Sequence, residues 1–175
     1  RALDILAVAR DVLEKGDVND FTIRNIAGRL GMYVRNVTYY FPRKQDLIEA
    51  VLAEKVSEYD QRIEAIVAAI DPDAETALIA VIEFYVDELR DPVVRRTALR
   101  IWALLATQDA YKGGLLEALY GRNFASRFIP LIAAALPDLS DDELTLRAQM
   151  VASLIEGAIL FAGAQRLTDA RVSID

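Results

Sequence analysis

The sequence contains no cysteine and no histidine. Without cysteine, the chain forms no disulfide, no thiolate zinc site, no iron–sulfur cluster and has no cysteine nucleophile. Without histidine, it has no Ser-His-Asp triad, no H-E-x-x-H zinc site and no imidazole general base. Only carboxylates, lysine, tyrosine or an oxygen-ligated metal remain for catalysis. These absences disfavour an enzyme, and we expect neither a metal nor another cofactor.

Glycine and proline are scarce as well, with eight and five among 175 residues, while 54% of the residues are hydrophobic and 27% are charged. This composition is typical of an ordinary globular protein. The most apolar stretch, 150–164, is too short for a bilayer and contains Ser153 and Glu156. No signal-peptide core is visible, and Arg1 in place of methionine suggests that a leading segment is missing. We expect a cytoplasmic protein that does not contact a membrane.

Charge is distributed unevenly along a chain whose net charge is −7. Residues 1–55 hold nine basic and eight acidic side chains, whereas residues 56–175 hold eleven and nineteen. The segment 22–44 holds five basic side chains and no acidic one. A basic segment in an acidic chain favours attraction of a polyanion to one face. By charge alone, simple solvation of these side chains is an equally good interpretation.

Apolar residues recur at helical spacing in nearly every segment, and no segment alternates with the period of a strand. The pattern predicts an all-α fold with helices near 2–13, 23–30, 34–41, 44–70, 74–89, 93–108, 115–136 and 143–165. Gly31 separates two short helices and suits a turn with positive φ. Two short helices joined by such a turn are typical of a helix-turn-helix.

One further pattern runs through the segment 22–47, and its residues are Thr22, Ile26, Ala27, Gly31, Val37, Tyr40, Phe41, Lys44 and Leu47. In this register the segment resembles the DNA-binding domain of TetR/AcrR-type transcriptional regulators. The resemblance implies a three-helix DNA-binding domain with a helix-turn-helix over 1–43. It also implies a long linker helix that starts near 44 and a helical ligand-binding and dimerisation domain over 44–175.

Ten residues are candidates for contacts to double-stranded DNA. The first turns of the helix at 34–41 would read bases, because such side chains reach deepest into the major groove. Arg35 suits guanine and Asn36 suits adenine, although surface solvation of either is nearly as good an interpretation. Phosphate contacts would come from residues such as Thr22 and Lys44. The full set is Thr22, Arg24, Tyr33, Val34, Arg35, Asn36, Thr38, Tyr39, Tyr40 and Lys44.

Three positions depart from the family pattern. Family members commonly have serine where Tyr33 stands, tyrosine where Thr38 stands, and serine or asparagine where Arg43 stands. The residues at 33 and 38 therefore change the usual contacts to bases and phosphates. Arg43 gives up a helix N-cap worth about 1 kcal/mol and adds a candidate phosphate contact.

Aromatic and small residues mark two further candidate sites in the rest of the chain. The aromatic residues lie on helices that in the family enclose an effector pocket, although aromatic residues at helical spacing are more often core. The candidates for ligand binding are Trp102, Phe84, Tyr85, Tyr111, Tyr120 and Phe124. Small residues in 144–165 allow close helix approach and favour a homodimer. The candidates for its interface are Ala148, Ala152, Ile155, Ala158, Ile159 and Ala162.

We expect a ligand-responsive transcriptional repressor that binds a palindromic operator as a homodimer and is released by a small apolar or aromatic effector. One alternative is an all-α enzyme or small-molecule carrier that uses carboxylates such as Glu83 or Asp87. Another is a DNA-binding protein that responds to no effector. The identity of the effector, the operator sequence, the regulated genes and the choice between repression and activation do not follow from the sequence.

Overall fold

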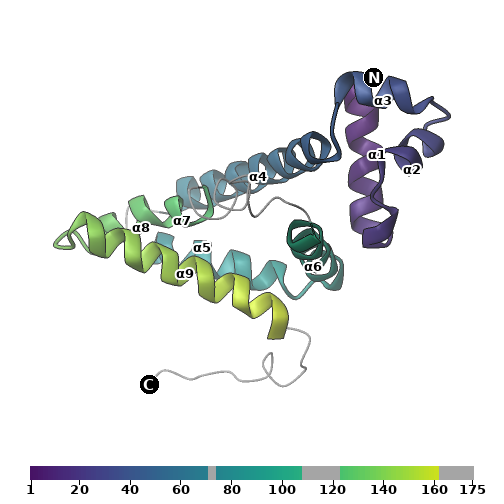
Figure 1. Ribbon diagram of the computed structural model, residues 1–175. Helices are drawn as coiled ribbons and strands as arrows, with labels where there is room; N and C mark the ends of the chain where they lie inside the picture. Colours follow the sequence, from purple (N-terminus) through teal and green to yellow (C-terminus); the bar gives the residue numbers. More distant parts are fainter. Residues whose placement is uncertain (71–73, 108–122, 162–175) are drawn as a thin grey trace. The chain divides into compact units, whose positions relative to one another are not determined.

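The computed structural model describes residues 1–70, 74–107 and 123–161, and in these ranges the chain is helical without any strand (Figure 1). This confirms the predicted fold class. The helices are α1 (Ala2–Lys15), the 3₁₀ helix η1 (Val18–Asp20), α2 (Ile23–Arg29), α3 (Val34–Tyr40), α4 (Lys44–Ala69), α5 (Ala74–Glu88), α6 (Pro92–Thr107), α7 (Asn123–Ser126), α8 (Phe128–Ala135) and α9 (Asp141–Phe161).

The chain divides into two compact units. The first comprises 1–64 and 100–116, and the second comprises 65–99 and 117–175. The division falls within α4 and within α6, so the first half of α4 groups with the N-terminal helices. The predicted domain boundary between residues 43 and 44 stays a prediction.

In the first unit, α1, α2 and α3 lie together (Figure 1), and their apolar side chains form a small buried core. Ile26 and Val37 are fully buried in it, and Phe21, just before α2, is buried with them. Gly31 adopts φ +63° in the turn between α2 and α3, as expected, and a side chain there would be strained. The turn therefore fixes the angle between two helices that are only seven residues long each.

Polar contacts fasten α1 to α4 and α6 within the first unit. Arg10 of α1 pairs with Glu54 at 2.5 Å and with Glu58 at 2.8 Å, and these bonds raise the pKa of Arg10, with the hydrogen bond to Glu54 as the main cause. Lys55 of α4 pairs with Glu14 at 3.0 Å. The guanidinium of Arg100 on α6 donates to the carbonyl oxygens at the C-terminus of α1. The first half of α4 is thereby held against the three-helix core.

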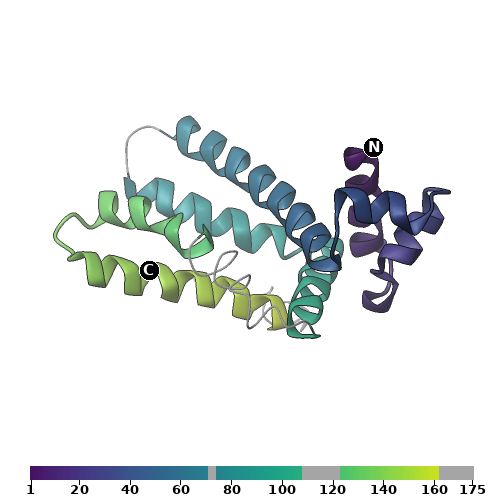
Figure 2. The same ribbon diagram turned by 45° about the horizontal axis from the view of Figure 1, so that its top comes forward.

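In the second unit, α5, α8 and α9 pack together, with α7 against α8 and α9 (Figure 2). Fully or almost fully buried side chains come from each helix, including Val81 of α5, Phe128 and Ile132 of α8, and Ala148 of α9. The small side chain at 148 permits close approach of α9 to its neighbours. The second unit therefore builds its own apolar core.

Two details of the helix prediction were wrong. The predicted helix at 115–136 is interrupted in its described part at Arg127, between α7 and α8. Pro130 explains the interruption, because proline has no N–H to donate to the carbonyl of Ser126 and its ring crowds that carbonyl. The 3₁₀ helix η1 was not predicted, although Asp17 and Asp20 form a capping box around it. Its three residues carry no periodic apolar signal.

Candidate nucleic-acid interface

All ten residues predicted to contact DNA belong to the first unit. They lie on α2 and α3, at the N-caps of these two helices, and at the first position of α4. Eight of them are exposed, and Thr38 and Lys44 are half-buried. The structure thus brings the sequence candidates onto the helix-turn-helix and leaves most of their side chains accessible. Whether each contacts DNA stays a prediction.

Helix α3 separates a buried position from a polar and aromatic surface. Val37 points into the core with no exposed area, whereas Tyr33 and Tyr39 are 72% and 81% exposed. The rings of Tyr39 and Tyr40 meet edge to face, with their centroids 5.1 Å apart. Exposed tyrosines present a hydroxyl donor and a ring face to a partner, which makes this face suitable for binding.

The five basic side chains of 22–44 fall into two groups. Arg29 pairs with Asp11 at 3.3 Å, and Arg43 pairs with Asp46 at 2.5 Å. Arg24, Arg35 and Lys44 have no acidic partner in the part of the chain that the structure describes. We call these three the unpaired cations. They are the positive charges that remain available for phosphates or bases.

Lys44 stands at the first position of α4, beside the aromatic ring of Phe21. Its ammonium lies 5.9 Å from the centroid of that ring. Burial lowers the pKa of Lys44, because the ammonium loses part of its water shell. A partly desolvated ammonium without a carboxylate partner gains more from a phosphate than a fully hydrated one does. This geometry supports the phosphate contact that the family resemblance implies.

The two threonines of the set use their hydroxyl groups within the protein. Thr22 is the N-cap of α2, since its Oγ1 accepts the backbone N–H of Asn25 at 3.1 Å. Thr38 donates its hydroxyl to the backbone carbonyl of Arg35 at 3.2 Å. The tyrosine that the family commonly has at position 38 is thus replaced by a side chain that turns back onto α3.

Asp46 is a helix-capping residue that the sequence interpretation missed. Its carboxylate accepts the backbone N–H of Arg43 at 2.9 Å, and therefore caps the start of α4 from within the helix. The same carboxylate accepts the guanidinium of Arg43, and this pairing lowers the pKa of Asp46. Asp46 supplies this half of a capping box, but not the bond that a serine at position 43 would accept from the first turn, and it occupies the guanidinium of Arg43 that was predicted to contact a phosphate. The sequence signal that could have identified this cap is an acidic residue three positions after the residue that precedes the helix.

The predicted ligand-binding residues are spread over both units. Trp102 is half-buried in the first unit. In the second unit the ring of Tyr85 contacts those of Phe84 and Phe128, with centroids 5.4 and 5.9 Å apart, and Arg127 donates to its hydroxyl at 3.4 Å. Tyr111 and Tyr120 lie outside the described residues, as does the side chain of Phe124. The buried Tyr85 cluster also serves as core.

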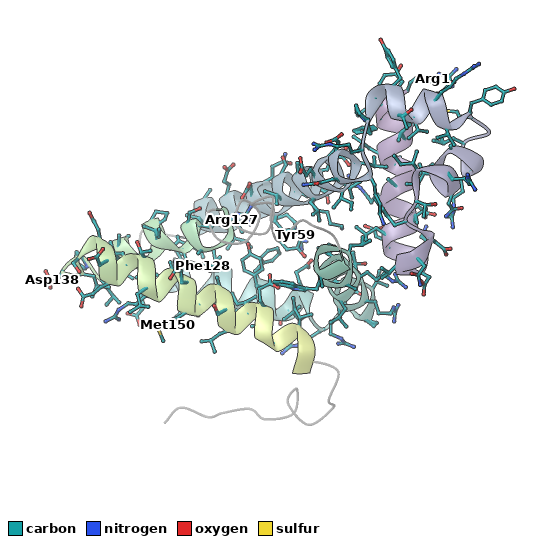
Figure 3. The ribbon with its side chains drawn as sticks, viewed as in Figure 1. Arg1, Tyr59, Arg127, Phe128, Asp138 and Met150 are labelled. Carbon is teal, nitrogen blue, oxygen red and sulfur yellow. The ribbon has the colours of Figure 1, made fainter. Side chains whose placement is uncertain are left out.

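The predicted dimer interface lies largely inside the second unit. The structure buries four of its six residues in the core of this unit, because α9 turns that face toward α5, α7 and α8; they are Ala148, Ala152, Ile155 and Ile159. Ala158 is half-buried, and Ala162 lies outside the described residues. Another face of α9 exposes Leu146, Met150 and Leu154, and the side chain of Met150 points away from the neighbouring helices (Figure 3).

Three observations bear on the alternatives. Among the described residues, no group of three or more acidic side chains is arranged to hold a metal ion. No helix in those same residues is long and apolar enough to cross a membrane. Glu83 and Asp87 are exposed on α5, and Asp87 pairs with Arg90 at 2.8 Å. These carboxylates therefore do not line a buried site.

Comparisons with known proteins agree with this geometry. Residues 5–51 match the family model described as bacterial regulatory proteins, tetR family. The chain is 30% identical over 151 residues to the HTH-type transcriptional regulator BetI of Cronobacter sakazakii (strain ATCC BAA-894), which covers 83% of this chain and 70% of that protein. The chain belongs to the TetR family of transcriptional regulators.

A solved structure supports the fold of this TetR-family regulator over nearly its whole length. A putative transcriptional regulator from Saccharomonospora viridis, solved in complex with choline, superposes with a TM-score of 0.68 over 98% of this chain and 87% of that one, at 24% identity. Proteins of this family are transcriptional regulators with a DNA-binding helix-turn-helix, so the enzyme alternative is set aside.

Proposed function

We propose that this TetR-family regulator is a cytoplasmic, ligand-responsive repressor that binds a palindromic operator as a homodimer. The observation that carries the DNA contact is the set of unpaired cations, Arg24, Arg35 and Lys44, on an otherwise acidic chain. Lys44, Thr22, Tyr39 and Tyr40 contact phosphates and position the protein. Arg35 and Asn36 reach base edges in the major groove, with Arg35 on a guanine.

The homodimer is supported by apolar surface that is exposed in the described part of the chain. Leu146, Met150 and Leu154 recur at every fourth residue, so they form one stripe along α9. Three large apolar side chains on one stripe are poorly placed in water, and the second unit already fills its own core with the other face. We assign the interface between two copies to this stripe rather than to the buried small residues.

A selection experiment tests the operator. Repeated binding of the protein to a pool of random duplexes should enrich a palindrome whose two half-sites are about 34–36 Å apart, one turn of DNA, because a two-fold dimer presents two recognition helices. Enrichment of a sequence without two-fold symmetry would contradict the dimeric mode. Failure to retain any duplex at low salt would contradict DNA binding itself.

The effector is proposed to be a small molecule with apolar or aromatic surface that binds in the second unit. Phe84, Tyr85 and Phe128 supply three rings in contact. Thr97 on α6 supplies a buried hydroxyl that finds no hydrogen-bond partner among the described residues. Such a hydroxyl costs about 1–3 kcal/mol unless a water or ligand satisfies it. The rings suit an apolar or aromatic group of an effector, and the hydroxyl of Thr97 suits a polar group of it.

Choline is the first compound to test, because the similar regulator from Saccharomonospora viridis was solved with it. A matched control is 3,3-dimethylbutanol, which has the same shape and hydroxyl but no charge. If the rings recognise a cation, only choline raises the melting temperature and loosens the operator. If both compounds act, the site recognises shape and the hydroxyl. If neither acts while an aromatic compound does, the effector class is aromatic.

A further inference from the structure

Tyr33 is the residue immediately before α3, where the family commonly has a small N-cap residue. It stands at the N-cap, but its side chain makes no capping hydrogen bond. Its ring is 72% exposed, so it adds little to the core. Neither of the usual structural roles of this position therefore explains a tyrosine.

The ring of Tyr33 lies against the guanidinium of Arg35. The central carbon of that guanidinium is 5.0 Å from the ring centroid, which is within the range of a cation–π contact. Arg35 is exposed and has no acidic partner in the described part of the chain. The aromatic ring is thus the group that restricts where this side chain points.

Orientation matters because of how arginine reads DNA. A guanidinium that recognises guanine must present two N–H groups in one plane to O6 and N7. A free arginine on a surface loses rotamer freedom when it adopts that single arrangement. A ring that already holds the guanidinium reduces this loss and leaves its edge available to a base.

We propose that Tyr33 is a positioning residue that orients Arg35 for reading a guanine in the operator, and is therefore a determinant of sequence specificity. The inference rests on the proposed DNA-binding function and on the placement of Arg35 at a base. Tyr33 acts through Arg35, so its effect depends on the presence of both Arg35 and the guanine. A direct contact of Tyr33 with DNA would not have this dependence.

The test uses the full chain and the duplex enriched from the random pool. Single guanines in that duplex are replaced by 7-deazaguanine, which lacks the N7 acceptor. The guanine read by Arg35 is the one whose replacement weakens binding of the wild type but not of Arg35→Ala. Affinities for the duplex with and without this replacement are then measured for Tyr33→Leu and Tyr33→Phe, alone and combined with Arg35→Ala. Melting temperatures of all variants establish that they are folded.

The expected result is that Tyr33→Leu weakens binding to the guanine duplex by about two- to fivefold, the value of an exposed cation–π contact. Its affinity for the 7-deazaguanine duplex and for random DNA stays unchanged, and it has no effect in the Arg35→Ala background. Tyr33→Phe, which keeps the ring, binds like the wild type.

Other results overturn the inference. An equal loss in the presence and absence of Arg35 means that Tyr33 touches DNA itself, and a loss in Tyr33→Phe assigns the role to its hydroxyl. The inference is also refuted if no guanine is found whose replacement affects the wild type but not Arg35→Ala, or if Tyr33→Leu binds like the wild type. In both cases the proposed operator binding is unaffected. If the wild type enriches no duplex from the random pool, the proposed operator binding is contradicted, and the inference about Tyr33 is contradicted with it.

Discussion

On α2, α3 and the start of α4, the first unit turns tyrosines and unpaired cations toward solvent, whereas α9 of the second unit turns leucines and a methionine toward solvent. In the first unit the core is complete, since Phe21, Ile26 and Val37 are buried by their own chain. The described part of the second unit also buries side chains of its own, such as Val81, Phe128 and Ala148, yet an exposed apolar stripe remains on α9. The comparison indicates two kinds of partner: a polyanion for the first surface and another apolar surface for the second.

The largest expected effect tests the apolar half of this comparison. A variant with Met150→Arg and Leu154→Arg should be a monomer in sedimentation, because burying these charges between two helices costs several kcal/mol. It should also lose high affinity for a duplex with two half-sites, since a monomer binds one half-site and makes none of the contacts at the other. The monomer should stay folded, as circular dichroism would show, because both positions are exposed in the single chain, although its melting temperature should fall by the stabilisation that dimerisation gave.

Thr145→Arg is the control for added charge on the same helix, since Thr145 is exposed and lies off the stripe of Leu146, Met150 and Leu154. It should remain a dimer. If Met150→Arg with Leu154→Arg is also a dimer, the interface lies elsewhere.

A smaller effect tests the polar half. Arg35→Ala should weaken binding to the enriched duplex by about 1–3 kcal/mol and change binding to random DNA little, because a bidentate contact to guanine carries sequence information. Arg29→Ala removes the same charge from an exposed arginine that pairs with Asp11. It should leave the ratio of specific to random affinity unchanged. Equal losses in the two variants would remove Arg35 from the base-reading role.

The first unit was the more predictable from sequence. Its short helices carry their own signals, such as the capping Thr22, the turn glycine Gly31 with φ +63°, and Pro42 after α3. Most candidates for DNA contact are exposed because a helix that buries Ile26 or Val37 must turn its other side to solvent. What the sequence could not supply was the pairing of Arg29 with Asp11, which depends on the packing of α1 against α2.

The second unit was less predictable because α9 carries two apolar faces. The stripe of Ala148, Ala152 and Ile155 and the stripe of Leu146, Met150 and Leu154 have the same helical spacing. Spacing alone does not tell which face meets the helices of the same chain. The smaller side chains allow the closer approach, and the structure packs these inward. We therefore propose the larger ones for the interface between two copies.

The smallest expected effect concerns Asp46, which neutralises Arg43 at the edge of the DNA-binding surface. Asp46→Asn should free Arg43 for a phosphate and steepen the dependence of log K on log salt by up to about 0.9. An unchanged slope would show that Arg43 does not reach DNA even when released.

The same substitution has a consequence for stability. Arg43 lowers the pKa of Asp46 in the folded protein, so the interaction stabilises the fold above the ordinary aspartate pKa and is lost as pH falls through the lowered value. Asp46→Asn should therefore melt below the wild type at neutral pH, and the difference should shrink in acid. A difference that persists at acidic pH would assign the effect to something other than the charge of Asp46.

The most direct test of the central claim is the salt dependence of binding to a random duplex for two triple variants with the same change in net charge. Replacing the unpaired cations Arg24, Arg35 and Lys44 by glutamine should reduce the slope of log K against log salt by about 1.8, about 0.9 for each phosphate neutralised by Arg24 and Lys44, whereas Arg35 reads a base and adds little on a random duplex. Replacing Lys15, Arg29 and Arg43, which are paired with Asp11 or Asp46, should reduce it far less. Equal reductions in the two variants would show that overall charge, and not this surface, binds DNA.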